Sequence, residues 1–141
     1  MANEATVSCS LSVRKGNIQY QSNPRTFSAT VTGTKGPSPG AITAPTAGVA
    51  VDLSELVQPS LCRIQNLDDT NFVEVGIRDT EADLFFPLME LLPGESYVIR
   101  LTRNIGEEYT GFGTGTSAAT NTLWIKADTA ACVVLVEAFE V

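Results

Sequence analysis

Residues 61–101 have the pattern of short strands joined by tight turns, and this pattern limits the possible folds more than any other feature of the chain. In the second of these strands, Asn71–Arg78, the side chains of Val73, Val75 and Ile77 alternate with polar or small residues. An apolar residue at every second position is typical of a strand that buries one face. The stretch therefore predicts a β-sheet.

Turn-forming residues separate the strands of this stretch. Residues 68–70 turn the chain after the first strand, and Pro93-Gly94 turns it before the fourth. Pro87 lacks an N–H group, so the third strand, Leu84–Leu91, is expected at a sheet edge or at a bulge. The inward face of the fourth strand is expected to carry Tyr97, Ile99 and Leu101.

The first 31 residues show the same alternation in a more polar form. From Thr6 to Val13, hydroxyl-bearing residues occupy one face and apolar residues the other, and a turn at residues 15–17 follows. Two further strands, separated by Asn23-Pro24, continue the pattern. We expect a β-meander with a solvated Ser/Thr face. Its inward side chains would be Val7, Cys9, Leu11, Val13, Ile18, Tyr20, Phe27, Ala29 and Val31.

Two stretches rich in glycine interrupt the strands. Residues 33–48 are rich in glycine and proline, and residues 106–121 are rich in glycine and threonine. We expect the first to be an extended arm or loop and not a linker between domains, because the flanking strands are too few to form an independent domain, and we expect the second to be a long surface loop. Such segments often contact a neighbouring subunit. Residues from these stretches and from two late strands are the expected interface candidates: Pro37, Pro39, Ile42, Pro45, Phe112, Trp124 and Phe139.

The last strand, within residues 130–141, is apolar on both faces. Such a strand lies centrally between two layers or is covered by a partner. With about ten short strands and no amphipathic helix, the chain fits an all-β antiparallel β-sandwich of two packed sheets, a class that includes the jelly roll. We expect one such domain over residues 1–141.

Composition and charge disfavour several kinds of partner. Nine Lys and Arg residues stand against sixteen Asp and Glu residues, for a net charge of −7. Because nucleic acid and anionic membranes attract clustered basic residues, neither is an expected partner. No apolar run approaches the roughly 18 residues of a transmembrane helix. The N-terminal residues also lack the basic and apolar regions of a signal peptide.

Side chains suited to catalysis are scarce. The chain has no His, which removes the usual general base and the Ser-His-Asp and Cys-His arrangements. The three cysteines are expected to be buried reduced thiols. Asp79, Glu81 and Asp83 alternate on a turn as calcium ligands could, but solvated turn residues are the simpler interpretation. We expect no enzymatic activity and no cofactor.

Several motifs together resemble the small structural proteins of tailed bacteriophages. They are the string NLDDTNFVEVG at residues 66–76, Phe86-Pro87-Leu88, the turn Leu92-Pro93-Gly94-Glu95, and an N-terminal half ending in Thr-Gly-Thr-Lys at residues 32–35. A late strand over residues 123–127, followed by an apolar strand with an acidic tail over residues 133–141, is similar as well. The chain departs from the pattern by ending in Phe139-Glu140-Val141 and by its longer loop at residues 106–121.

The resemblance implies a virion component without enzymatic activity. The expected role is that of a capsid cement or decoration protein on the capsid surface, where it would bind the major capsid protein lattice as a trimer or dimer. The alternatives are a neck or tail component and a receptor-binding module that holds a glycan on exposed aromatic residues. A lone carbohydrate-binding or hydrolytic domain is the least favoured, because His is missing and the carboxylates form no specific motif.

Overall fold

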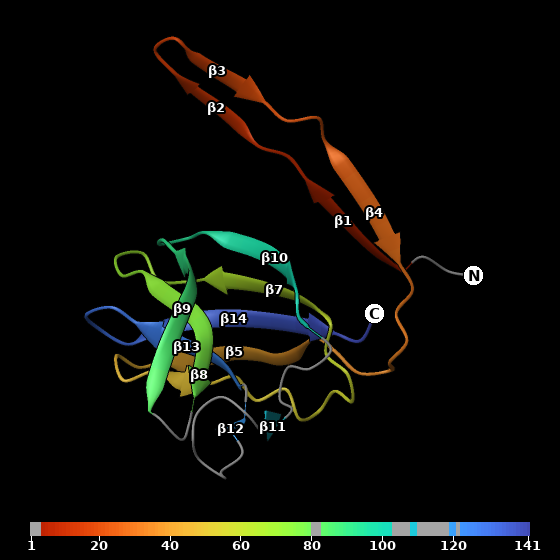
Figure 1. Cartoon of the computed structure of the whole chain (residues 1–141), viewed down its shortest axis with the longest axis vertical. Helices are drawn as coiled ribbons and strands as arrows, with labels where there is room; N and C mark the ends of the chain where they lie inside the picture. Colours follow the sequence, from red (N-terminus) through yellow and green to blue (C-terminus); the bar gives the residue numbers. More distant parts are fainter. Residues whose placement is uncertain (1–3, 80–82, 103–107, 110–118, 121) are drawn as a thin grey trace.

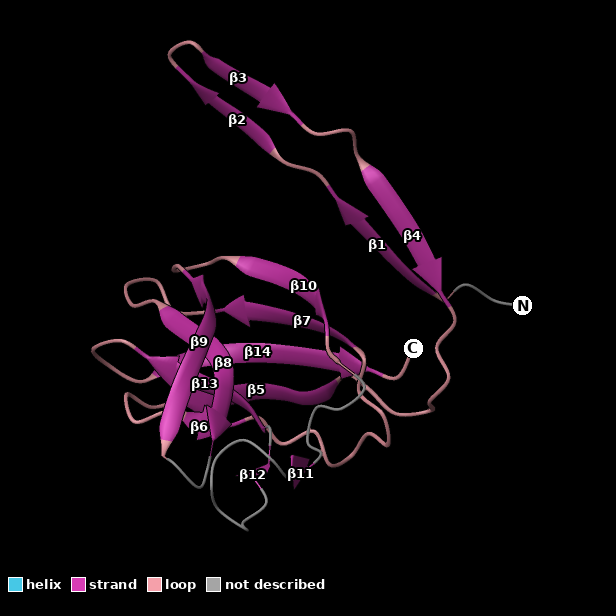
Figure 2. Cartoon of the chain, in the orientation of Figure 1, coloured by secondary structure: helices cyan, strands magenta, loops and turns pink. Residues whose placement is uncertain are grey.

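In the computed structural model the chain is all-β, and its strands form antiparallel sheets (Figures 1 and 2). The structure describes residues 4–79, 83–102, 108–109, 119–120 and 122–141. Among these residues there is no helix, and hence none long and apolar enough to cross a membrane. The prediction of an all-β fold with antiparallel sheets is confirmed.

Residues from Ser38 onward form a body with two four-stranded sheets. The first has the order β10 (Ser96–Arg100), β7 (Leu61–Asn66), β14 (Cys132–Phe139) and β5 (Ser38–Ala44). The second has the order β6 (Val49–Ala50), β13 (Thr122–Ala127), β8 (Val73–Asp79) and β9 (Leu84–Leu91). A short pair, β11 (Glu108–Tyr109) and β12 (Ala119–Thr120), falls between β10 and β13 in the chain.

The hydrophobic core contains buried side chains of both sheets, as in a sandwich. Val134 and Val136 of β14 are fully buried, and Val75 of β8 and Ile125 of β13 join the same cluster from the other sheet. Burying such a side chain stabilises the folded state by roughly 1.5–3 kcal/mol relative to leaving it exposed. β14 lies between β7 and β5 in its sheet, but only one of its faces is buried in the core; on the other face Val133 is 45% exposed, so the last strand does not lie between two layers.

A polar cluster closes the turn after β7, within the NLDDTN string. Asn66 is fully buried; its Nδ2 donates to the carbonyl oxygens of Asn71 (2.8 Å) and Leu91 (3.2 Å). Asp68 Oδ1 accepts the backbone N–H groups of Asn71 at 2.6 Å and Thr70 at 2.8 Å. Both bonds lower the pKa of Asp68, and the bond from Asn71 has the larger effect. The turn predicted at residues 68–70 is thus confirmed.

The turn and edge predictions around β9 are also confirmed. β9 lies at the edge of its sheet, and its pairing with β8 shifts register between Val75, which is opposite Met89, and Gly76, which is opposite Pro87. At the next turn Gly94 has a φ of 77°, which glycine adopts without strain. β10 follows this turn directly.

The N-terminal part departs from the prediction. β1 (Ala5–Cys9) pairs with β4 (Arg25–Ala29), and β2 (Ser12–Lys15) pairs with β3 (Ile18–Gln21). Residues 4–31 thus form one long hairpin, here called the arm, which projects from the body (Figure 1). Within the described chain no arm strand pairs with a body strand, so the expected meander inside the sandwich is wrong.

The alternation of the arm strands is nevertheless present. Val13 lies opposite Tyr20, and Ser8 lies opposite Thr26, so that apolar and polar side chains occupy separate faces. The apolar face lies in solvent, where Ile18 is 60% exposed, although it was expected to face inward. Periodicity determines which side chains share a face but not what covers that face.

Residues 33–48 do not form an extended arm or loop. Their central part, Ser38–Ala44, is β5, which pairs with β14 from Ser38 opposite Ala138 to Ala44 opposite Cys132. β5 is an edge strand, where the missing N–H of Pro39 can be tolerated. The other expected loop, residues 106–121, lies outside the described residues apart from β11 and β12.

Candidate interaction surfaces

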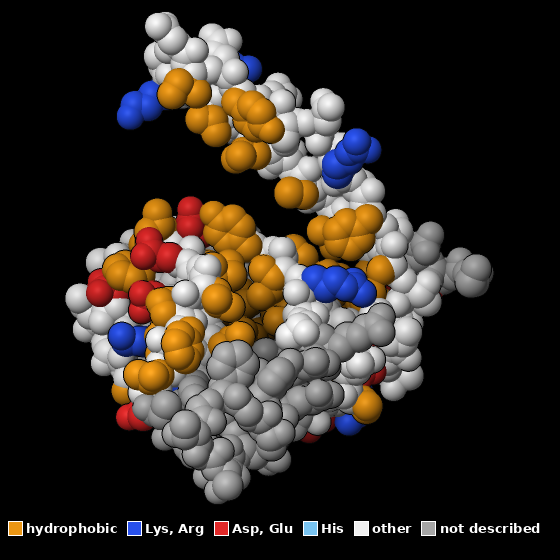
Figure 3. Space-filling model, in the orientation of Figure 1, with side chains coloured by type: hydrophobic (Ala, Val, Ile, Leu, Met, Phe, Trp, Pro, Cys, Tyr) orange, Lys and Arg blue, Asp and Glu red, His pale blue; other side chains and the backbone are white. Residues whose placement is uncertain are grey.

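One face of the arm is a line of apolar side chains. Val7 lies opposite Phe27 and Val13 opposite Tyr20, and Figure 3 shows hydrophobic side chains along the side of the arm that is turned toward the body. We call this set the apolar stripe; it consists of Val7, Leu11, Val13, Ile18, Tyr20 and Phe27. Apart from half-buried Val7, its members are exposed, from 39% for Val13 to 60% for Ile18.

The other face of the arm is polar. Ser8 Oγ lies 3.0 Å from Thr26 Oγ1 across the two strands, and Ser12 lies opposite Gln21 further out. A single two-stranded hairpin is only marginally stable in water. The arm's exposed apolar face is therefore a candidate interaction surface.

Charge is distributed unevenly between the arm and the rest of the chain. Residues 4–31 hold three basic side chains and one carboxylate, a net charge of +2; because the whole chain carries −7, the rest carries −9. Lys15 and Arg25 share the face of the apolar stripe, since they pair across the strands with Ile18 and Cys9. That face of the arm is therefore both apolar and basic.

Two hydrogen bonds lie at the base of the arm, one within the arm and one between the base and the C-terminal segment of the body. The Val31 N–H donates to Glu4 Oε2 at 3.0 Å, and the Thr32 N–H donates to the carbonyl oxygen of Glu140 at 2.9 Å. Gly33 packs so closely on the Glu140 carboxylate that a Cβ at this position would overlap it. These contacts determine the direction in which the arm leaves the body.

A groove of about 260 Å³ lies between β1 and the first sheet at this base. Phe139 lines it from β14, and Val98 lines it from β10. The ion pair between Arg63 Nη1 and Glu137 Oε2, at 2.6 Å, belongs to the same wall. These two charges pair with each other, and the third charged side chain of the lining, Glu4, accepts the Val31 N–H, so the groove belongs to the seam between arm and body.

A second groove opens between β9 and β10, where the edges of the two sheets meet. It measures about 270 Å³ and is lined by apolar side chains that include Ile77, Met89 and Ile99. Exposed apolar side chains flank it on β9 and β10, from 71% exposure for Leu88 to 47% for Tyr97. We call the groove and these side chains the front patch (Figure 3). Its exposed members are Leu84, Phe86, Leu88 and Tyr97.

The interface candidates within residues 33–48 do not lie on a projecting loop. Pro39 and Ile42 are half-buried on β5, and Ile42 packs against the core. Pro37 is exposed just before this strand. Pro45 is half-buried, and its carbonyl oxygen accepts two backbone N–H groups. Their side chains therefore form no shared surface with the apolar stripe.

The remaining candidates come from the second half of the chain. Trp124 is half-buried on β13, with the guanidinium carbon of Arg78 4.4 Å from its ring centroid, and a Cβ at Gly48 would overlap its Nε1. Its ring is thus covered on two sides by its own chain. Phe139 lies beside the base of the arm, and Phe112 lies outside the described residues.

The expected calcium position falls partly outside the described residues, because Glu81 and the side chain of Asp79 are not described. Asp83 forms an ion pair with Arg78. In the part of the chain that is described, no group of three His, Cys, Asp or Glu side chains is placed to hold a metal ion.

The three cysteines are free thiols in two different environments. Cys62 and Cys132 are fully buried, as expected, and burial raises the pKa of Cys62 to about 12. Cys9 is exposed on the arm, so the expectation that it is buried is wrong. The reason is that β1 pairs only with β4, and Cys9 is the last residue of β1, beyond the part of this strand that lines the groove at the base of the arm.

Sequence reasoning missed the apolar stripe, which was assigned to the core, and it also expected Tyr97 to face inward, although this side chain is 47% exposed on the front patch. One signal for the stripe was present in the sequence, since the first 31 residues are basic within an acidic chain. No known family, curated protein or solved structure matches the chain. The interpretation of these surfaces therefore depends on their geometry and charge.

Proposed function

We propose that the chain is a non-enzymatic structural protein of a virion, which binds the outer surface of a phage capsid as a cement or decoration protein. The observation that carries this proposal is the arm, whose apolar stripe no described part of the body covers. Exposed apolar surfaces of this kind mark association sites. In a protein that joins many identical subunits, a projecting arm of this kind can bind a neighbouring subunit.

In this role the arm and the body have different tasks. The body is a packed scaffold, and the arm reaches across the seam between neighbouring capsomers and buries its apolar stripe there. A standard protein interface buries about 1,600 Å², and many copies on one lattice add avidity. The partners are then the major capsid protein and other copies of the chain, with no nucleic acid and no membrane.

The proposal includes a jelly-roll body. Its support is the order of the strands, since the body strands of the two large sheets alternate between these sheets along the chain except at the β8–β9 hairpin. A double sheet of eight strands made from two Greek keys is the jelly roll, which occurs in viral capsid and lectin domains. This connectivity fits the virion role and also fits a glycan-binding one.

A receptor-binding or neck and tail module is the second candidate. The exposure of two aromatic side chains on the front patch, Phe86 at 51% and Tyr97 at 47%, favours it, because glycans stack on exposed rings. Counting copies per virion by quantitative mass spectrometry separates the two roles. A copy number close to the number of capsomers in the capsid supports the capsid role. A copy number close to the number of subunits in one ring supports the neck or tail role.

Capsid binding tests the proposed function directly. Capsids of the encoding phage, produced without this protein, are mixed with the purified chain and sedimented. We expect the wild type to saturate the capsids. Tyr20→Asp should weaken capsid binding by at least about tenfold, because it places a charge on the apolar stripe. Gln21→Asp, on the polar face of the same strand, is the matched control. Capsids that bind no wild-type protein would rule out the cement role.

A further inference from the structure

We infer that the apolar stripe of each arm packs on the front patch of a second copy of the chain, so that each copy gives one arm and receives one. The inference rests on the proposed function only in treating the chain as an assembly protein. It concerns the contact between copies in solution and does not require a capsid.

The arm does not cover the front patch of its own body. Figure 3 shows the apolar side of the arm turned toward the apolar surface of the body across an open gap. The hydrogen bond from Thr32 to Glu140 and the packing of Gly33 on Glu140 hold the arm in this direction. While these base contacts persist, another molecule must supply the surface that covers the stripe.

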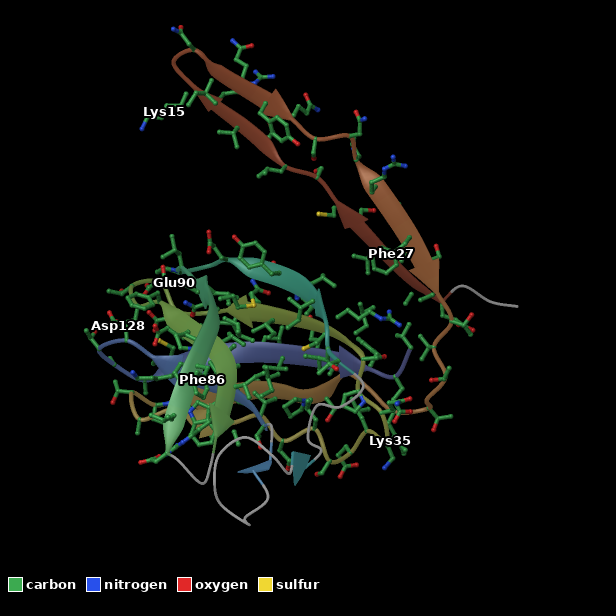
Figure 4. All side chains as sticks on the ribbon, viewed as in Figure 1. Lys15, Phe27, Lys35, Phe86, Glu90 and Asp128 are labelled. Atoms are coloured by element: carbon green, nitrogen blue, oxygen red, sulfur yellow. The ribbon has the colours of Figure 1, made fainter. Side chains whose placement is uncertain are left out.

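Charge favours the body of a second copy over its arm as that surface. Two stacked arms would repel each other, because each has a net charge of +2. An arm with a net charge of +2 is attracted to a body, because the rest of the chain carries −9. In Figure 4, Lys15 lies at the tip of the arm, and Glu90 and Asp128 lie at the end of the body below that tip. Opposite charges around an apolar contact orient the two copies.

The area of the contact is sufficient for a stable assembly. The arm extends from Ala5 to Lys15. A ribbon of about 11 residue pairs at about 3.3 Å per residue is about 36 Å long and, at about 10 Å width, covers about 360 Å². With both surfaces of each contact counted and two arms exchanged, about 1,400 Å² is buried, which lies within the range of specific interfaces.

The front patch also has a suitable shape. Its groove of about 270 Å³ forms a hollow that is lined mostly by apolar side chains of both sheets, with Arg100 and Thr102 as its polar lining residues. An apolar side chain of the arm can insert there while its neighbours pack on Leu88 and Tyr97. This places the central part of the arm over the opening between β9 and β10.

Paired variants test both surfaces by analytical ultracentrifugation of the purified full chain. Val13→Asp on the stripe should raise the dissociation constant between copies by at least about tenfold, and Ser12→Asp on the opposite face should leave it within about twofold. Leu88→Glu on the front patch should weaken association to a similar degree. Val133→Glu, a change at a 45% exposed position on the face of β14 that is turned away from the core, should not. Circular dichroism confirms that each variant is folded.

Crosslinking from Cys9 identifies what covers the stripe. Cys9 is the exposed thiol and lies in the arm, so a benzophenone maleimide attached there reports on its surroundings. Copies with normal and heavy nitrogen are mixed, irradiated and analysed by mass spectrometry. We expect mixed-isotope crosslinks from the arm to residues of β9 and β10. Crosslinks from arm to arm, crosslinks within one copy, or a chain that stays monomeric at all concentrations would overturn the inference.

The two proposals can fail separately. A chain that exchanges arms in solution but binds no capsid contradicts the capsid role and leaves the exchange standing. A monomeric chain that saturates capsids contradicts the exchange and leaves the capsid role standing.

Discussion

Val13 and Tyr20 lie directly opposite each other across β2 and β3, and their side chains are 39% and 55% exposed. Val136 and Ile64 are paired in the same way across β14 and β7, and both are fully buried. The two pairs have the same local character, with two apolar side chains on one face of an antiparallel ladder. They differ in what lies above that face, a second sheet in the body and solvent in the arm.

Removal of residues 1–31 should therefore leave the body folded. The arm contributes no residue to the buried core cluster, and every strand from β5 to β14 remains. We expect the free energy of unfolding in urea to stay within about 1 kcal/mol of the full-length value, because only contacts at the base are lost.

A longer truncation is the control for the arm deletion. Removal of residues 1–44 also deletes β5 and leaves one edge of β14 unpaired, which should unfold or aggregate the chain. If the two truncations unfolded equally, the arm would be part of the body's folding unit, contrary to this structure.

Replacement of Asn66 by Ala should destabilise the body by about 2–4 kcal/mol. The Asn66 side chain is fully buried and satisfies the carbonyl oxygens of Asn71 and Leu91 and the N–H of Asp68. Without it, the buried carbonyl oxygen of Leu91 loses this partner at about 1–3 kcal/mol, and the two partly buried groups of Asn71 and Asp68 lose theirs at a smaller cost because water can reach them. Asp69→Ala, an exposed change in the same turn, should cost less than about 1 kcal/mol in the same urea titration.

Two glycines with positive φ should respond differently to replacement by Ala. Gly94 (φ 77°) has no heavy atom within 4 Å of the added Cβ, so Gly94→Ala should cost about 1–2 kcal/mol from backbone strain alone. Gly48 (φ 84°) has a similar backbone, but its Cβ would overlap Trp124 Nε1. Gly48→Ala should therefore cost about 1–3 kcal/mol more. Equal thermal shifts for the two variants would show that the Trp124 ring moves aside freely.

The strands of the body were predictable because local signals and burial agree there. Pro87 marked an edge strand, the DDT turn followed β7, and Leu84–Leu91 coincides with β9. Each of these signals depends on a few neighbouring residues, which the sequence displays directly. The apolar second face of β14 was less predictable, since the residues of this strand do not show that only one of its faces is covered.

The interaction surfaces were harder to predict because they depend on long-range placement. The alternation in the arm is the same whether or not a second sheet covers it, so Leu11 and Ile18 were assigned to the core. Residues 33–48 were expected as an extended loop because of their Gly and Pro content, but pairing with β14 makes Ser38–Ala44 an edge strand. Only the partner strand, which lies far away in the sequence, decides between these outcomes.

The cysteines offer a test of the arm's exposure. In the native protein Cys9 should react with a maleimide within minutes at pH 7, whereas Cys62 and Cys132 should react only after unfolding in urea. Cys62 is shielded sterically, and its pKa of about 12 keeps the thiol protonated and unreactive. Peptide mapping by mass spectrometry assigns the modified residue. Fast native labelling of Cys62 or Cys132 would contradict the closed core.

The acid sensitivity of the body should depend partly on Asp68. Hydrogen bonds from the N–H groups of Asn71 and Thr70 hold the pKa of Asp68 below its ordinary value, so the folded state favours the charged carboxylate. Its contribution to stability is therefore present above the unfolded pKa of about 3.9 and is lost as the pH falls through the lower folded pKa. We expect Asp68→Asn to be less stable than the wild type at pH 7, with the difference narrowing as the solution is acidified below pH 4. Urea midpoints measured across this range check the prediction, and Asp69→Asn controls for the change in net charge. A difference that stays constant with pH would mean that Asp68 acts through its shape and not through its charge.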